Sequence, residues 1–347
     1  MGFALPMRST RRFSWTLAGG LLSLCLGGAA AQVGPVSGPA PAPVAQMALT
    51  TAPAWAYPVL PSTAPPAVPD DGVKHSLAGS RQAFTRAELF DLFTAHDWLP
   101  ESHPPMPAVV ARGRPPEVRA CGMCHYPNGQ GRPENAALAG LPAAYIVQQL
   151  QDYKAGLRRS AAAHAGPHLR MVAVATHVSD EEVRAAAAYF AAQPYRPWIT
   201  VLEADQVPLT QVVTGSMWAA VPGTAREPIG QRIVEVPQDL GLTELRDPRS
   251  GFTAYVPPGS VSRGRQIALQ GEGAVLACVS CHGPELKGLD PIPPLAGRSA
   301  QYLYRQLNDM RLGFRAGPGS AAMRGFIGQL SPQDMMAVVA YAASLPP

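Results

Sequence analysis

Two short cysteine motifs constrain this 347-residue chain more than any other feature. Residues 121–125 read CGMCH and residues 278–282 read CVSCH. Each motif therefore places two cysteines three positions apart and a histidine directly after the second. The remaining cysteine, Cys25, lies near the N-terminus. Any fold proposed for the chain has to explain why the same arrangement occurs twice.

Four chemistries use a Cys-x-x-Cys pair, namely a zinc ribbon, a thioredoxin-like redox pair, a disulfide and covalent haem attachment. A zinc ribbon needs its two pairs about 15–20 residues apart, whereas 153 residues separate Cys124 from Cys278. A thioredoxin-like pair needs a βαβ setting, which neither motif has. An exported protein could also oxidise such cysteines. The histidine after each pair is typical of haem attachment, in which the thiols form thioethers and the imidazole binds the iron. We predict two covalent haem c groups, held by Cys121, Cys124 and His125 and by Cys278, Cys281 and His282.

An internal repeat supports this interpretation. The segment LAGLPAAYIVQQLQDYKAGLR (138–158) matches LAGRSAQYLYRQLNDMRLGFR (295–315) at the same offset as the cysteine motifs. A second block, VSDEEVRAAAAYFAAQP (178–194), matches LSPQDMMAVVAYAASLP (330–346) at an offset of 152, because the stretch between the two blocks is five residues shorter in the second copy. Fixed-offset similarity indicates a duplicated structural unit, so the chain is expected to contain two copies of one haem domain.

Each copy is expected to be helical. Apolar residues recur at helical spacing over 142–155 and 299–312. Ser179 with Glu182 forms a capping box at the start of a last helix, and Ser331 with Pro332 opens its counterpart. Strand signals are weak in both copies. The sequence therefore predicts an all-α protein.

The sixth ligand of each haem iron is expected to be a methionine. Met171 lies eight residues before Ser179, and Met323 lies eight residues before Ser331, in segments that we interpret as loops. The last copy has no histidine after His282, which excludes a second histidine ligand from within it. For the first haem, three histidines near Met171 remain alternative ligands: His164, His168 and His177. Three further methionines fall on helical patterns and are expected in the core: Met310, Met335 and Met336.

Together, the CxxCH, LAG…YxxxQLxDxxxGxR, Met and LSxxD…AYxAS segments resemble the two-haem class I bacterial cytochromes c, over roughly 120–195 and 260–347. The resemblance implies two tandem α-helical haem domains that face each other and transfer electrons in the periplasm. It also implies that the carbonyl of Pro294 holds the proximal imidazole. Ala137 stands in the equivalent place of the first copy, which leaves that hydrogen bond open. Arg158 and Arg315 resemble residues near the haem propionates, although solvated arginines are an alternative.

The remaining segments complete the expected domain organisation. A basic start followed by an apolar run and small residues indicates a cleaved signal peptide and hence export. Between the two copies, short β-like stretches such as ITVLEA suggest strands or extended chain, without a third cofactor. The expected parts are a signal peptide (1–31), a Pro/Ala-rich tether, disordered or extended (32–78), a first haem domain (79–195), an extended or irregular connecting segment (196–257) and a second haem domain (258–347).

These features predict a periplasmic dihaem electron carrier. Removal of the signal peptide leaves 25 basic and 24 acidic residues of the 28 and 24 in the whole chain, so binding to nucleic acid is not expected. The expected partners are redox proteins: a periplasmic dehydrogenase, a quinol-oxidising complex or an oxidase, with peripheral membrane association left open. The alternatives are a dedicated cytochrome subunit of one dehydrogenase and a dihaem peroxidase. Methionine ligands on both irons would close the site that a peroxidase needs.

Overall fold

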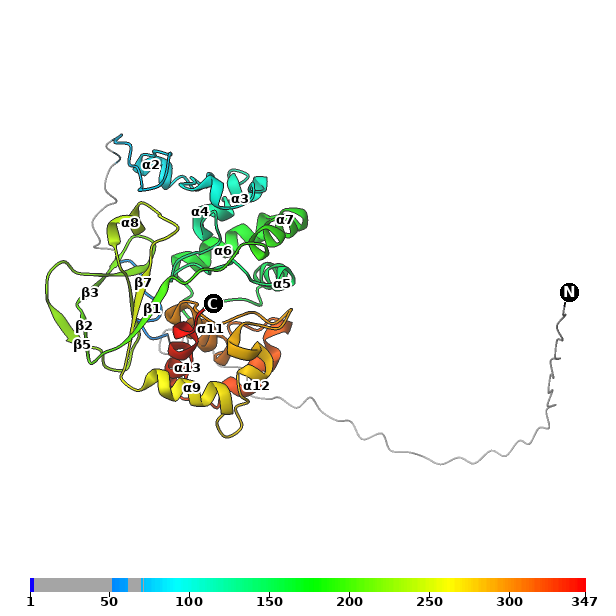
Figure 1. Cartoon of the computed structure of the whole chain (residues 1–347), viewed down its shortest axis with the longest axis vertical. Helices are drawn as coiled ribbons and strands as arrows, with labels where there is room; N and C mark the ends of the chain where they lie inside the picture. Colours follow the sequence, from blue (N-terminus) through cyan, green and yellow to red (C-terminus); the bar gives the residue numbers. More distant parts are fainter. Residues whose placement is uncertain (3–51, 62–69, 71) are drawn as a thin grey trace, which may run out of the picture. The chain divides into compact units, whose positions relative to one another are not determined.

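The computed structural model describes residues 1–2, 52–61, 70 and 72–347 (Figure 1). Apart from residues 1–2, the expected signal peptide lies outside the described residues, as does much of the expected tether. The description below concerns the compact unit formed by Pro43–Pro347. Among the described residues, no helix is both long enough and apolar enough to cross a membrane.

Each repeat forms the two long helices that its sequence predicts, together with helices that the sequence did not predict. The first repeat contains α4 (Cys121–His125), α5 (Ala143–Lys154), α6 (Gly166–His177) and α7 (Asp180–Ala191). The second contains α9 (Ser260–Gln270), α10 (Val279–His282), η2 (Pro284–Leu286), α11 (Ala300–Arg311), η3 (Pro318–Ser320), α12 (Ala321–Ile327) and α13 (Pro332–Ser344). In both repeats the helix after the LAG segment packs against the last helix, α5 against α7 and α11 against α13.

The predicted helix starts are confirmed. Ser179 accepts a hydrogen bond from the backbone N–H of Glu182, whose carboxylate accepts one from the N–H of Ser179 in return. Ser331 caps α13 by accepting from the N–H of Asp334, with Pro332 at the first helical position. These side chains satisfy N–H groups that have no partner within the helix, which fixes where each last helix begins.

The connecting segment (196–257) differs from the prediction, because it is folded rather than irregular and contains the strands that make the protein more than all-α. Its strands are β1 (Ile199–Glu203), β2 (Gln206–Pro208), β3 (Thr210–Val213), β4 (Met217–Ala220), β5 (Arg226–Pro228), β6 (Val234–Pro237) and β7 (Phe252–Val256), and its helix is α8 (Leu240–Glu244). They form a three-stranded sheet of order β1-β7-β6 and two hairpin-like pairs, β2-β5 and β3-β4. The first and last strands of the segment pair in parallel, Ile199 beside Phe252. That pairing is non-local, so short strand signals alone could not reveal it.

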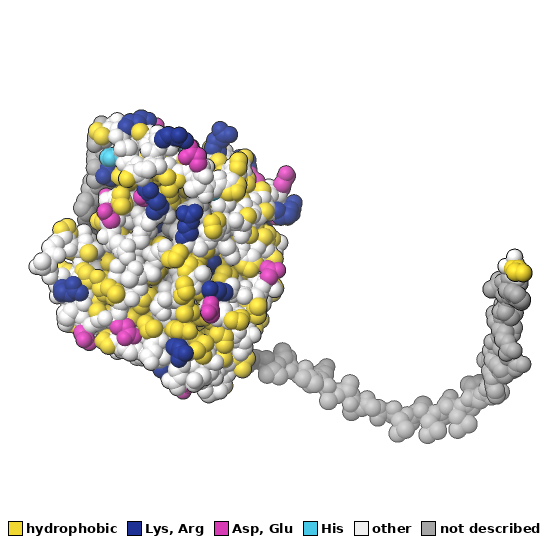
Figure 2. Space-filling model, viewed as in Figure 1, with side chains coloured by type: hydrophobic (Ala, Val, Ile, Leu, Met, Phe, Trp, Pro, Cys, Tyr) yellow, Lys and Arg dark blue, Asp and Glu magenta, His cyan; other side chains and the backbone are white. Residues whose placement is uncertain are grey.

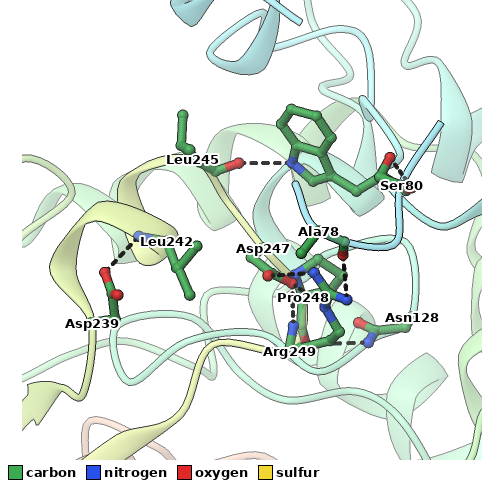
Figure 3. A network of polar contacts seen from close by, with 10 residues as sticks. Ala78, Ser80, Asn128, Asp239, Leu242, Leu245, Asp247, Pro248 and Arg249 are labelled. Atoms are coloured by element: carbon green, nitrogen blue, oxygen red, sulfur yellow. Dashed lines mark hydrogen bonds and ion pairs between the residues drawn. The ribbon is translucent and has the colours of Figure 1, made fainter. Parts of the chain in front are cut away.

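A stretch before the first repeat, residues 72–119, packs on the connecting segment. It contains α2 (Arg86–Leu89), η1 (Pro100–Ser102) and α3 (Ala108–Ala111). The indole N–H of Trp98 donates to the carbonyl of Leu245 at 2.8 Å, and Arg249 donates to the carbonyl of Ala78 at 3.0 Å (Figure 3). Asn128, close to the first cysteine motif, donates to the carbonyl of Pro248 at 3.4 Å. The loop after α8 thus links the connecting segment to residues 72–119 and to the start of the first repeat.

Residues 52–61, here called the N-terminal anchor, fall within the predicted tether but are packed against the second repeat. The ring centroid of Trp55 lies 4.5 Å from that of Tyr304, and the indole of Trp218 donates to the carbonyl of Trp55 at 2.8 Å. Ala56 and Tyr57 are buried. The proline-rich composition suggested an extended tether. The rings of Trp55 and Tyr57 nevertheless bury enough apolar surface to fix this stretch against the second repeat.

In the second repeat, α9 crosses α13 at close range. Gly264 of α9 makes the approach possible, because a Cβ at this position would lie 1.9 Å from the carbonyl oxygen of Ala337. The side chain of Arg263 adds an ion pair to Asp334 with an N–O distance of 2.9 Å. In the first repeat α7, which corresponds to α13, contacts the four-residue α3 instead.

Candidate haem-binding sites

The first cysteine motif forms its own short helix, α4. Cys121, Cys124 and His125 lie three and four positions apart, which puts them on one face of a helical turn. Both thiols are free and half-buried, and the histidine is buried. The second motif repeats this arrangement in and just before α10, with Cys278 as the N-cap, Cys281 half-buried and His282 buried. The structure therefore presents two equivalent sets of thiols and imidazole.

Backbone carbonyls orient both imidazoles. Nδ1 of His125 lies 2.7 Å from the carbonyl oxygen of Ala136, and Nδ1 of His282 lies 2.9 Å from that of Pro293. The expected partner of the second imidazole, Pro294, is therefore wrong by one residue. In the first repeat, where the hydrogen bond was left open, it forms with Ala136 rather than Ala137. The carbonyl of Pro294 instead accepts from Nε of Arg298 at 2.8 Å. Because any residue supplies a backbone carbonyl, the alanine of the first repeat serves as well as the proline of the second.

Burial lowers the pKa of both His125 and His282 and keeps their rings neutral at pH 7. With Nδ1–H donating to a carbonyl, the lone pair of the ring lies on Nε2 and is free to bind a metal. The carbonyl therefore fixes both the tautomer and the orientation of each ring. Such a neutral, oriented imidazole is what an iron ligand requires.

Met171 lines the same cavity as the first motif. One cavity is lined by both cysteines of the first motif, by His125 and by Met171, with apolar walls that include Leu150. A second, adjoining cavity also contains His125 and Met171 and extends to the second repeat. Of the alternative ligands, His168 lines only this second cavity, whereas His164 and His177 are exposed. Met171 thus lines both cavities that His125 lines.

Both candidate methionines lie on helices, which corrects the prediction of loops. Met171 is in α6 and Met323 is in α12. Glycine and proline before them suggested loops, but proline is well tolerated at a helix start. Met323 is partly buried and packs, as Cys278 does, against the core cluster of the second repeat. Three methionines predicted for the core are buried there: Met310, Met335 and Met336.

Arginines from the two repeats meet reciprocally at the domain interface. The guanidinium of Arg158 donates to the hydroxyl of Tyr302 and to the side-chain oxygen of Gln306, both at 3.1 Å. In the same way Arg315 donates to Tyr145 at 2.7 Å and to Gln149 at 2.8 Å. Both arginines are buried, so the solvated alternative is wrong.

Sequence reasoning missed these tyrosines and glutamines as interface residues, because it counted the tyrosines among the apolar positions. The signal was present in the repeated YxxxQL pattern, where a glutamine recurs inside an otherwise amphipathic helix. The backbones of the two loops also pair, since the N–H of Arg159 donates to the carbonyl of Phe314 and that of Ala316 to Leu157, each at 2.7 Å. The two repeats therefore contact through equivalent surfaces.

The residues of the first site fit a covalently bound haem. The cavity walls are mostly apolar, the thiols are free, and the imidazole of His125 and the thioether of Met171 line the same cavity. The ring of Phe190 packs edge-on to that of His125, with centroids 6.4 Å apart. The second site supplies the same thiols and imidazole with the same carbonyl contact.

The fold and the paired motifs define a class I cytochrome c with two haem domains. The sequence model of the family, described as cytochrome c, matches residues 112–193 and 261–346. Cytochrome c-554(548) of Halomonas halodenitrificans is 40% identical over 78 residues, which are 94% of that protein and 22% of this chain. The chain therefore belongs to the cytochrome c family, carries two haem c groups and is an electron carrier.

Longer relatives cover both repeats. Cytochrome c4 of Azotobacter vinelandii is 29% identical over 243 residues, which are 69% of this chain and 89% of that protein. A thiosulfate dehydrogenase electron acceptor of Stutzerimonas stutzeri is 28% identical over 238 residues, 67% of this chain and 82% of that protein. A solved structure of thiosulfate dehydrogenase from Marichromatium purpuratum aligns with a TM-score of 0.46 and 26% identity. The alignment covers 69% of this chain and 39% of that chain.

Proposed function

We propose that the protein is a periplasmic dihaem cytochrome in which His125 and Met171 bind one iron and His282 and Met323 bind the other. The position of Met171 carries the proposal, because this residue lines both cavities that contain His125. Cys121 and Cys124 would hold the first haem through thioethers, and Cys278 with Cys281 would hold the second. Met323 takes the place of Met171 by its matched distance from the capping serine.

A bound haem supplies reversible one-electron chemistry, and the protein's residues set its conditions. The carbonyls of Ala136 and Pro293 keep the two imidazoles in one orientation. Apolar side chains such as Leu150 and Phe190 line the cavity and would keep water from a haem bound there. A methionine sulfur as the second axial ligand favours a higher reduction potential than a second histidine does. The arrangement therefore supports electron transfer at two closed iron sites.

The interface between the repeats is the proposed path of internal electron transfer. Arg158 lines the cavity of the first haem and reaches Tyr302 and Gln306 of the second repeat. Because Arg315 makes the reciprocal contacts, the two haem edges would be held at a fixed separation. The arginines position the two domains and would place positive charge near the propionates of a bound haem.

The proposed electron donor is a periplasmic dehydrogenase, and the acceptor is an oxidase or another terminal acceptor. The similarity to a thiosulfate dehydrogenase electron acceptor supports a dehydrogenase partner. It also favours the second candidate, a dedicated subunit of one dehydrogenase, for which residues 72–119 and the connecting segment would form a docking surface. On the face drawn in Figure 2, basic and acidic side chains are interspersed with hydrophobic ones, which fits a protein partner better than an anionic membrane.

Two measurements test the proposal. The intact mass and haem staining of the exported protein should show two covalent haems, and the ferric spectrum should show two low-spin irons with a methionine-sulfur band. Pull-down from periplasm with the holoprotein then separates the candidates. A single stoichiometric dehydrogenase would support the dedicated subunit, whereas rapid reduction by several donors would support a general carrier. A mass with one haem, or native peroxide turnover of about 1 per second or more, would contradict the carrier with two closed sites.

A further inference from the structure

The N-terminal anchor touches only one of two equivalent aspartates at the domain interface. Asp309 of α11 and Asp152 of α5 occupy the same position of the repeated motif. The hydroxyl of Tyr57 donates to Oδ1 of Asp309 at 2.8 Å and accepts from the side-chain amide of Asn308 at 3.0 Å. Arg305 of the same helix donates to the carbonyl of Ala56 at 2.9 Å. These three hydrogen bonds and the burial of the Tyr57 ring hold the anchor beside Asp309.

Asp309 lies at the edge of the first haem's cavity although it belongs to the second repeat. It lines the cavity that contains His125 and Met171, and Tyr57 lines it beside Asp309. The side chain is 6% exposed, and its Oδ1 also accepts from the backbone N–H of Ala161 at 2.9 Å. A buried carboxyl group is therefore held at a fixed place next to one haem site.

The matching aspartate of the first repeat has different partners. Asp152 is equally buried and accepts from the side chain of Gln148 at 2.9 Å. It packs against Gly317, where a Cβ would lie 2.0 Å from Oδ2. Pro318 stands where the other side has Ala161, so no backbone N–H is available from that residue. The two aspartates thus share a sequence position but not a chemical environment.

We propose that Asp309, held by Tyr57, is a proton-binding group whose occupancy is coupled to the oxidation state of the first haem. The proposal rests on the proposed placement of that haem between His125 and Met171. When an external reductant gives one electron to the ferric iron, the cavity gains one negative charge. The carboxylate of Asp309 then takes one proton from water, forming one O–H bond, and releases it again when the iron is oxidised.

The groups around Asp309 make it a suitable proton acceptor. Burial raises the pKa of Asp309 to about 6, against hydrogen bonds from Ala161 and Tyr57 and positive charge that lower it. The charged and titratable groups that face it or share its cavity come from several neighbouring segments: Tyr57, His125, Glu134, Tyr145, Tyr153, Arg158, Arg159, His168, Tyr302 and Arg305. Reduction of the iron should raise the pKa of Asp309 further, because added negative charge favours the protonated carboxyl group.

The test measures the potentials of both haems in the holoprotein from about pH 5 to about pH 9, which brackets a carboxyl group of raised pKa. The variant Met171→His assigns the first haem, because only its potential should fall. In the native protein the reduction potential of the first haem should decrease as the pH rises through the pKa values that Asp309 has in the oxidised and the reduced protein. The total decrease should be about 59 mV for each tenfold difference in proton affinity between the two oxidation states. Asp309→Asn should abolish this decrease and the matching proton uptake, measured with a pH indicator on reduction in weak buffer.

Asp152→Asn is the matched control and should leave the pH dependence of the first haem unchanged. Tyr57→Phe keeps the ring in place but removes a donor to the carboxylate, so the midpoint of the pH dependence should move to higher pH. A pH dependence and proton uptake that persist in Asp309→Asn, with a native visible spectrum, would overturn the proposal and assign the proton to a haem propionate. If Met171→His shifted neither potential, the ligand placement itself would be wrong, which is a different and recognisable failure.

Discussion

In the second cytochrome c domain the last helix, α13, is crossed by an 11-residue helix, α9. In the first domain the last helix, α7, contacts only the four-residue α3 at that place. The helix that follows the LAG segment, α5 in the first domain and α11 in the second, also starts differently in the two domains. Pro142 precedes α5 without a side-chain cap, while Ser299 caps α11 and Glu235 of β6 accepts from the N–H of Gln301 at 2.9 Å. The cysteine motifs are equivalent, but the segments that pack around them are not. Duplication therefore preserved the haem-binding part of each domain and left its surroundings free to differ.

The largest expected effect tests whether the two iron sites are equivalent. Met171→His and Met323→His should each keep the affected iron low-spin and lower its potential by on the order of 0.1–0.3 V, inside the range of roughly 0.8 V that axial ligands span. Met171→Ala and Met323→Ala should remove the sulfur band of one haem each and allow weak peroxidase activity. Spectroelectrochemistry measures both. An unchanged spectrum in Met171→Ala would make a histidine such as His168 the ligand.

The next effect tests the contact that only the second domain has. Glu235 is fully buried, and burial raises its pKa to about 7. Because the folded state holds the proton more tightly than the unfolded state, stability falls as the pH rises from about 4.5 to about 7. Glu235→Gln removes the group that titrates. The loss of unfolding free energy between pH 4.5 and pH 8 should therefore be smaller in the variant than in the native protein, by up to about 3 kcal/mol.

Denaturant unfolding at the two pH values measures this difference. Exposed Glu181→Gln on α7 is the control and should show no such reduction of the loss. An equal pH dependence in Glu235→Gln and the native protein would show that Glu235 stays charged in the folded state.

A smaller effect tests the two loops that face the paired aspartates. Gly317→Ala forces a Cβ to 2.0 Å from a carboxylate oxygen of Asp152 and should cost about 1–3 kcal/mol of unfolding free energy. Ser160 stands at the equivalent position of the first repeat and already carries a Cβ, so Ser160→Ala should cost less than about 1 kcal/mol. Chemical denaturation of both variants under one condition gives the comparison. Equal costs would mean that the interface relaxes around Gly317.

The smallest effect concerns a feature in which the domains agree. Ser179→Ala and Ser331→Ala each remove the side-chain cap of a last helix and should each cost about 1 kcal/mol. Similar losses in unfolding free energy would confirm that the two last helices begin in the same way. A markedly larger loss for Ser331 would show that its additional hydrogen bond to the carboxylate of Asp334, at 2.8 Å, contributes as much as the cap itself.

Sequence alone determined the local features of this protein. The cysteine motifs, the helices around 142–155 and 299–312 and the serine caps are encoded within a few residues, and each appears where it was predicted. Repetition strengthened these predictions, because chance patterns would not recur in the same order at the nearly equal offsets of 157 and 152 residues. The candidate methionines were found by the same matched spacing, although they lie on helices rather than in loops.

Only the tertiary structure decided which distant segments meet. The parallel pairing of β1 with β7, the position of Tyr57 beside Asp309 and the contact of Glu235 with α11 join residues that are far apart in the chain. Local propensity carries no signal for such contacts, since their stability comes from burial and hydrogen bonding after the chain has collapsed. For the same reason the sequence showed two equal aspartates, and only the fold placed a tyrosine against one of them.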